Sequence, residues 1–174
     1  MEMLYQIILV IVTGVIVFAT AFYVLKTFIE NENKKRLLEF KSQNMKLVTP
    51  IKLQAYERII LFLERISPNS LIVRLQVSGM KSHQLHVEML SLIRAEFEHN
   101  LSQQIYMSDS AWEVAISAKE NVIRLINMTS ESVDNNADAI ELSKAIMEQW
   151  IKLNPTPIKT AIIFIKNEVN TFLS

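Results

Sequence analysis

The amino-terminal part of the chain contains an uncharged apolar segment of 23 residues, from Met3 to Leu25. A helix of this length can cross the hydrocarbon core of a bilayer with some tilt. Because no water is present there to pair the backbone N–H and C=O groups, a single span has to be helical. The sequence therefore predicts a transmembrane anchor over residues 1–25, which would tie the rest of the chain to a membrane.

Basic residues lie on only one side of this segment. Six Lys or Arg side chains occur between Lys26 and Lys46, whereas only Met1 and Glu2 precede the segment. Lys and Arg are retained on the cytoplasmic side, so we expect the amino terminus outside and the carboxy-terminal domain in the cytoplasm. A cleaved signal peptide is the alternative, because Ala19-Thr20-Ala21 resembles a cleavage site. No basic residue precedes the apolar run, however, and the run continues past that point, which favours an uncleaved anchor.

Small and hydroxyl-bearing residues recur along one side of the apolar segment. Their spacing of three and four residues is that of a helical seam, and small residues at such a seam allow close approach of a second helix. We therefore predict association through the span, either with another membrane protein or in a homo-oligomer. The alternative is that the threonine hydroxyls bond back to their own helix. The candidate residues are Val10, Thr13, Gly14, Val17, Thr20 and Ala21.

Residues 26–48 are charged and contain neither Pro nor Gly, which predicts a helical stalk that continues outward from the anchor. Lys34, Lys35 and Arg36 are candidates for contact with anionic lipid headgroups, each contributing about 1 kcal/mol near the surface. Alternatively, this cluster is only a topology signal on a solvated face.

The charge balance of the chain argues against nucleic acid as a partner. The sequence has 18 Lys and Arg against 18 Asp and Glu, and nucleic-acid binders show a basic excess or face. There is no cysteine, which excludes disulfides, thiolate metal sites and a Cys nucleophile. With only two glycines, the chain also lacks a glycine-rich phosphate loop.

Helix start signals divide residues 49–174 into a predicted compact all-α bundle. Thr49-Pro50, Ser67-Pro68 and Thr156-Pro157 each place a capping residue before a proline, as helix starts do. The helix after Thr49 is apolar on two adjacent rows, so we expect it to be central and most buried. Residues 69–77 predict a short helix closed by Gly79, although Leu71 to Val77 also alternate as a strand would.

The other helices are expected from about Ser82 to Gln104, from a cap at Ser110 or Ser108 to about Ser132, and between the turn at 133–136 and Asn154-Pro155. Ser110 to Glu113 matches a capping box, and Ser108 is the competing cap. Inward-facing positions are expected at apolar residues of each helix. In the helix from Ser82 they are Leu85, Met89, Leu92, Ile93, Phe97 and Leu101, and in the helix that ends near Ser132 they are Trp112, Ile116, Val122, Ile123 and Ile126. In the helix before Asn154-Pro155 they are Ile140, Met147, Trp150 and Leu153, and in the last helix they are Ile158, Ala161, Ile162, Ile165, Val169 and Phe172.

No catalytic or metal-binding constellation is recognisable, and no cofactor is expected. The pair Glu96 and His99 has the spacing of di-iron bundles, but such sites need a second pair and further carboxylates. At 100° per residue, His83 and His86 point about 160° and 140° away from His99, so the three cannot share one ion. Glu96, Glu98, His99 and Asn100 do form a polar concentration at a helix end. They are a candidate partner surface or, as we prefer, a set that pins two helices together.

Two stretches, Leu53 to Ser70 and Arg94 to Trp112, resemble a family of small membrane-anchored helical proteins from Bacteroidota with no assigned function. The resemblance implies this architecture and a bacterial inner-membrane location, and adds nothing on mechanism. We therefore expect a membrane-tethered interaction or scaffold module, a subunit of a larger membrane complex, that is not an enzyme. The alternative is a helical bundle with a small-molecule pocket or an unrecognised activity.

Overall fold

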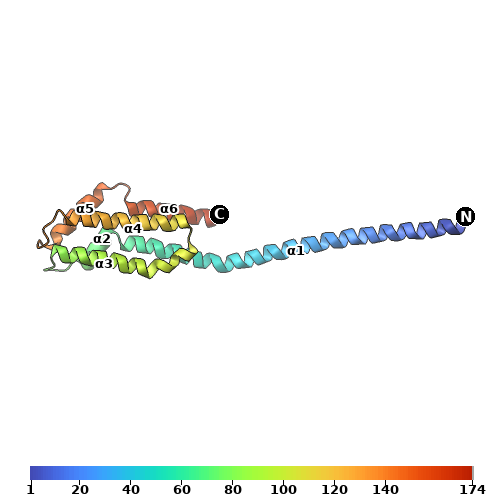
Figure 1. The fold of residues 1–174 in the computed structure, drawn as a ribbon, viewed down its shortest axis with the longest axis horizontal. Helices are drawn as coiled ribbons and strands as arrows, with labels where there is room; N and C mark the ends of the chain where they lie inside the picture. Colours follow the sequence, from blue (N-terminus) through green and yellow to red (C-terminus); the bar gives the residue numbers. More distant parts are fainter. Residues whose placement is uncertain (174) are drawn as a thin grey trace. The chain divides into compact units, whose positions relative to one another are not determined.

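The computed structural model describes residues 1–173, without the side chains at positions 41, 44 and 172. Within that range the chain is all-α, with one long amino-terminal helix followed by a compact bundle of shorter helices (Figure 1). This confirms the predicted fold class. The elements are α1 (Glu2–Arg65), α2 (Pro68–Leu75), α3 (Ser82–Asn100), the short 3₁₀ helix η1 (Leu101–Tyr106), α4 (Asp109–Ser130), α5 (Ala139–Lys152) and α6 (Pro157–Leu173).

Helix α1 passes through Pro50 without ending there, so the predicted helix start at Thr49-Pro50 is wrong. The φ angle of proline is close to that of a helix, and its missing N–H removes only one helical hydrogen bond. The turns on both sides can therefore continue as one helix of 64 residues. The start signal was misread because proline at a first turn and proline within a helix look alike in sequence.

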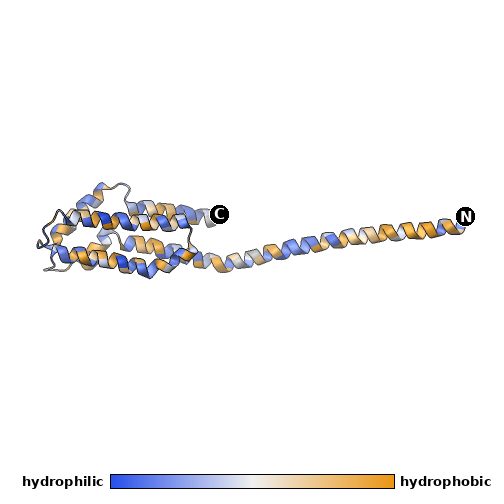
Figure 2. Ribbon diagram, in the orientation of Figure 1, coloured by the Kyte–Doolittle hydropathy of each residue, from blue (hydrophilic) through white to orange (hydrophobic). Residues whose placement is uncertain are grey.

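The chain divides into two compact units, Met1–Thr49 and Pro50–Ser174. The first unit is the amino-terminal part of α1. Its apolar side chains between Met3 and Leu25 are exposed, and Figure 2 shows this stretch as the most hydrophobic part of the helix. The following residues are more hydrophilic, in agreement with the charged composition of 26–48.

The second unit has one hydrophobic core, to which the carboxy-terminal part of α1 and helices α2 to α6 all contribute. Helix α4 packs against α3, α5 and α6, and α3 also packs against α2 and α5. The most deeply buried side chains of this core are Ile59, Phe62, Leu63, Ile66, Leu71, Leu85, Met89, Ile93, Ile126, Leu142, Ile146 and Ile165.

The helix caps agree with the predicted starts at α2 and α6 and differ from the prediction at α4. Ser67 accepts a hydrogen bond from the backbone of Ser70, and Thr156 Oγ1 accepts one from the N–H of Lys159, as expected for the predicted starts. At α4 the cap is Ser108, the competing candidate, whose Oγ accepts from the N–H of Ala111 at 3.0 Å, so the predicted capping box at Ser110 is wrong.

Residues 68–75 are helical, which decides between the helix and the strand that the alternating pattern allowed. The helix ends before Val77 at an extended cap, Gln76, and the predicted capping role of Gly79 is wrong. Gly79 instead lies in the following turn with φ of 81°, a conformation that glycine adopts without steric cost. Helix α3 begins close by at Ser82, and the adjoining chain is paired with the segment before α5 through Lys81 and Asp138.

Some inward-facing positions were predicted incorrectly. Helix α3 ends at Asn100 rather than near Gln104, and Leu101 at the start of η1 is exposed. In α5 the buried positions are Ala139, Leu142, Ser143 and Ile146, whereas Ile140 and Leu153 are exposed. The expected face of α5 included Ile140 and Leu153, but the helix buries the neighbouring row that contains Leu142 and Ile146. In α6, Ile158, Ala161 and Ile165 are buried as expected, and the side chain of Phe172 lies outside the described part.

Candidate interaction surfaces

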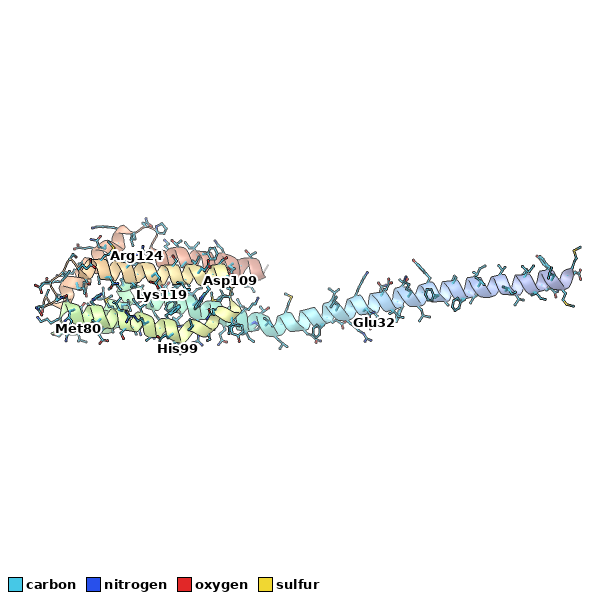
Figure 3. The ribbon with its side chains drawn as sticks, in the orientation of Figure 1. Glu32, Met80, His99, Asp109, Lys119 and Arg124 are labelled. Atoms are coloured by element: carbon cyan, nitrogen blue, oxygen red, sulfur yellow. The ribbon has the colours of Figure 1, made fainter. Side chains whose placement is uncertain are left out.

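Of the four candidate partner-surface residues on α3, two are buried and two are exposed to solvent. Glu96 is 7% exposed and Asn100 is 5% exposed, so both are buried. Glu98 and His99 point to solvent, and Figure 3 labels His99 on α3. Only Glu98 and His99 are therefore available at the surface.

The carboxylate of Glu96 joins three helices. Its Oε1 atom accepts from Arg65 Nε of α1 at 3.0 Å and from Arg74 Nη2 of α2 at 3.0 Å. A buried carboxylate is costly unless it is paired and hydrogen-bonded, and two guanidinium groups meet that need. Glu96 thus ties α1 and α2 to α3.

Asn100 makes a second connection one turn further along α3. Its Nδ2 donates to the carbonyl of Glu96 at 2.8 Å, and its Oδ1 accepts from Arg58 Nε at 3.3 Å. Arg58 also donates to the carbonyl of His99 at 3.4 Å, next to the end of the helix. Helix ends leave carbonyl groups without helical partners, and here a side chain from α1 satisfies one of them.

A third polar group links α1, α4 and α6 and was not found from the sequence. The hydroxyl of Tyr56 donates to Oε1 of Glu168, and the Ser108 Oγ donates to Oε2 of the same carboxylate at 2.7 Å. Burial and the bond to the Glu168 carboxylate raise the pKa of Tyr56 to about 12. Tyr56 is therefore neutral at ordinary pH and serves as a donor rather than as a base. The position of Tyr56 in an apolar row of the sequence could have predicted this group, because a buried hydroxyl needs a hydrogen-bond partner.

Aromatic rings connect α1, α3 and α4 beside these polar ties. The ring centroid of Phe97 lies 6.0 Å from that of Phe62 and 5.7 Å from that of Trp112. Lys119 Nζ sits 3.9 Å from the Phe97 ring centroid, a cation–π distance, and bonds to Glu120 at 2.9 Å (Lys119 is labelled in Figure 3). These side chains therefore form a packed contact between the helices.

A groove of about 710 Å³ runs between α4 and α5 and reaches the start of α6. Its walls are mixed in character, with Leu125, Met128 and Leu153 beside Arg124 and Glu148. It has the size range of small-molecule sites. Residues from three helices meet there, and the sequence had named Leu153 only as an inward-facing position and Pro157 only as part of a helix start, neither as a site residue.

The histidines do not come together in the described residues, where no group of three or more His, Asp or Glu side chains is placed to hold a metal ion. His86 is bonded to Asn127 Oδ1 at 2.8 Å, which links α3 to α4. Glu96, the other half of the di-iron-like spacing with His99, is engaged by the two arginines.

The candidate residues of the amino-terminal seam are all exposed on α1. The Thr13 hydroxyl donates to the carbonyl of Leu9 at 2.8 Å, and the Thr20 hydroxyl donates to that of Val17 at 2.9 Å. A Cβ atom added at Gly14 would meet nothing within 4 Å. In the single chain, therefore, the threonines use their own helix as partner, and the seam is open.

The basic cluster of α1 is also exposed, at Lys34, Lys35 and Arg36. Arg36 Nε lies 3.3 Å from Glu32 Oε1 of the preceding turn, and Glu32 is labelled in Figure 3. By length and composition α1 can cross a membrane, which fits an anchor or a signal sequence near the amino terminus.

No curated protein and no solved structure matches this chain. One family does match, over residues 2–172, and its description is that of a family of unknown function, DUF7935. Since the match covers the apolar segment, the charged part of α1 and the whole bundle, the chain belongs to the DUF7935 family over nearly its entire length.

Proposed function

We propose that this chain is a membrane-tethered helical interaction module, a subunit of a larger complex at the inner membrane of a bacterium of the Bacteroidota. Its amino terminus lies outside, its single span covers residues 1–25, and its bundle is cytoplasmic. The observation that carries the proposal is the exposed apolar part of α1, which suits lipid. Six basic residues follow it, in support of this orientation.

The bundle supports a binding role rather than catalysis. The polar side chains that sequence reasoning singled out, Glu96 and Asn100, are engaged in ties between helices. Its partners are the bilayer and, through contacts of the span, either another membrane protein or a second copy of the chain. Nucleic acid is not a partner, because the balance of basic and acidic residues provides no net attraction to it. Lys34, Lys35 and Arg36 follow the span closely enough to contact anionic headgroups.

The anchor and its orientation are tested by mass spectrometry of the mature chain and by protease treatment of intact and broken cells. We expect an intact amino terminus, retention in membranes after an alkaline carbonate wash, and digestion of the bundle only when the cytoplasmic side is opened. A mature chain that begins near Phe22, or digestion of the bundle from outside, would overturn the proposal.

The role of the seam is tested by purifying the native complex in mild detergent after chemical crosslinking. Gly14→Leu with Ala21→Leu adds bulk where close helix approach is expected, so the crosslinked partner should be lost. Val12→Leu with Ala19→Leu is the matched control, since these two residues have the same spacing and lie about 160° around the helix from Gly14 and Ala21. Unchanged crosslinking of the first variant would remove the seam from the proposal.

The groove between α4 and α5 favours a second candidate function, binding of a small molecule or an activity on one. Its size and its mixture of apolar and charged walls carry this alternative. Screening metabolites by thermal shift tests it, with Met128→Trp as the variant that fills the groove. A ligand that stabilises the natural chain and not the variant would establish this alternative.

A further inference from the structure

The charged part of α1 carries an apolar face whose described side chains are exposed. Six large apolar side chains between residues 37 and 48 are between 45% and 71% exposed. Leu37, Phe40, Leu47 and Val48 lie within about 100° around the helix, and we name these four the stalk face. Glu39 and Lys46 lie on the opposite side, so this stretch of α1 is amphipathic.

We propose that the stalk face is the contact surface for a second copy of this chain, packed as a parallel, in-register coiled coil. The inference rests on the proposed membrane anchor. Leu37, Phe40 and Leu47 are spaced three and seven residues apart, which is the spacing of core positions in one heptad pattern, and Asn44 occupies the remaining core position of that pattern in the sequence. A single Asn at such a position is compatible with a coiled coil and fixes its register at a cost in stability.

Lipid cannot cover this face when α1 is anchored through residues 3–25. The helix is unbroken, so Leu37 stands about 18 Å beyond Leu25 at 1.5 Å per residue. The headgroup layer is only about 5–8 Å thick on each side of the hydrocarbon core. The stalk face therefore lies in water, where another helix running alongside it can bury it.

Anchored copies meet the geometric requirement of a parallel coiled coil without further help. Two chains that cross the same bilayer in the same direction have parallel stalks, and identical spans bring identical residues to the same height. Leu47 of one copy thus faces Leu47 of the other. Arg36 beside the stalk face is paired with Glu32 of its own helix at 3.3 Å, which reduces repulsion between the two copies.

The area of this contact indicates that it depends on the membrane. Burying a large apolar side chain removes about 60–120 Å² from water, so four such side chains from each copy cover about 500–1,000 Å². Free proteins need about 1,200 Å² or more for a stable complex. Confinement of both copies to one bilayer raises their effective concentration and compensates for the smaller area.

The stalk face and the seam are different surfaces of α1. At 100° per residue, the centre of the stalk face lies about 120° around the helix from the centre of the seam at Gly14 and Ala21. A copy bound to the stalk face consequently leaves the seam open for a different helix.

Cysteine crosslinking in native membranes tests the proposal, because the chain has no cysteine of its own. Phe40→Cys and Leu47→Cys place one thiol on the stalk face, and the adjacent Glu39→Cys and Lys46→Cys are matched controls on the polar side. In a parallel, in-register pair each face residue meets its own counterpart, so oxidation should give disulfide-linked dimers at 40 and 47 at least about tenfold more than at 39 and 46. Equal yields at all four positions, or no dimer at 40 and 47, would overturn the proposal.

A carbonate wash of the same membranes separates this proposal from the proposed function. Retention of the Cys variants without dimers would remove only the contact between copies. Release of the chain from the membrane would instead overturn the anchor on which both depend. Fluorescence of Trp112 and Trp150 in each variant shows whether the bundle is intact.

Discussion

At the scale of single residues, the buried carboxylate of Glu96 connects α3 to both α1 and α2. Because one buried oxygen atom accepts from both Arg65 and Arg74, Glu96→Gln leaves two guanidinium groups without a charged partner. We expect the free energy of unfolding to fall by about 1–3 kcal/mol. Urea unfolding of the full chain in detergent, followed by tryptophan fluorescence, measures this. Glu98→Gln is the exposed control and should change stability by no more than about 0.5 kcal/mol.

Tyr56 gives the bundle a dependence on alkaline pH. Its pKa of about 12 in the folded chain lies above the usual value of 10, so between these values the unfolded chain loses a proton that the folded chain retains. Stability is therefore full below about pH 10 and declines as the pH rises toward 12. Tyr56→Phe should be less stable at neutral pH by about 1 kcal/mol, because it loses the bond to Glu168, and should lack this component of the decline. A decline identical to that of the natural chain would contradict the assignment.

At the scale of elements, the start of α4 depends on one hydroxyl. Ser108→Ala removes both the cap on Ala111 and a bond to Glu168, so we expect a loss of about 1–2 kcal/mol in the free energy of unfolding. Ser110→Ala changes an exposed residue two positions later and should have little effect. A larger loss at Ser110 than at Ser108 would show that the capping box forms after all.

The sequence predicted the elements better than their ends and faces. Proline after a small polar residue located the starts of α2 and α6, because the geometry of those starts is local. Pro50 led to a wrong prediction of a helix start, because the tertiary contacts of the residues after it decide whether the helix continues. The pairing of Glu96 with Arg65 and Arg74 brings together positions 22 or more residues apart, and spacing along one helix cannot reveal such contacts.

At the scale of the whole molecule, the buried hydrophobic residues described by the structure all lie between Ala55 and Ile165. Residues 50–174 thus contain a complete core, and a domain of this size can fold alone. We expect this fragment to be soluble and helical, with one cooperative unfolding transition seen alike by fluorescence and by circular dichroism. A fragment without a cooperative transition would show that the amino-terminal part of α1 is needed for folding.

The hydroxyls of Thr13 and Thr20 in α1 donate their hydrogen bonds to backbone carbonyls of the preceding turn. A neighbouring helix would therefore contact Thr13 and Thr20 through their shape, because their O–H donors are already engaged. Valine, which has nearly the outline of threonine, should be interchangeable there, and selectivity for a neighbour would reside in the missing bulk at Gly14 instead.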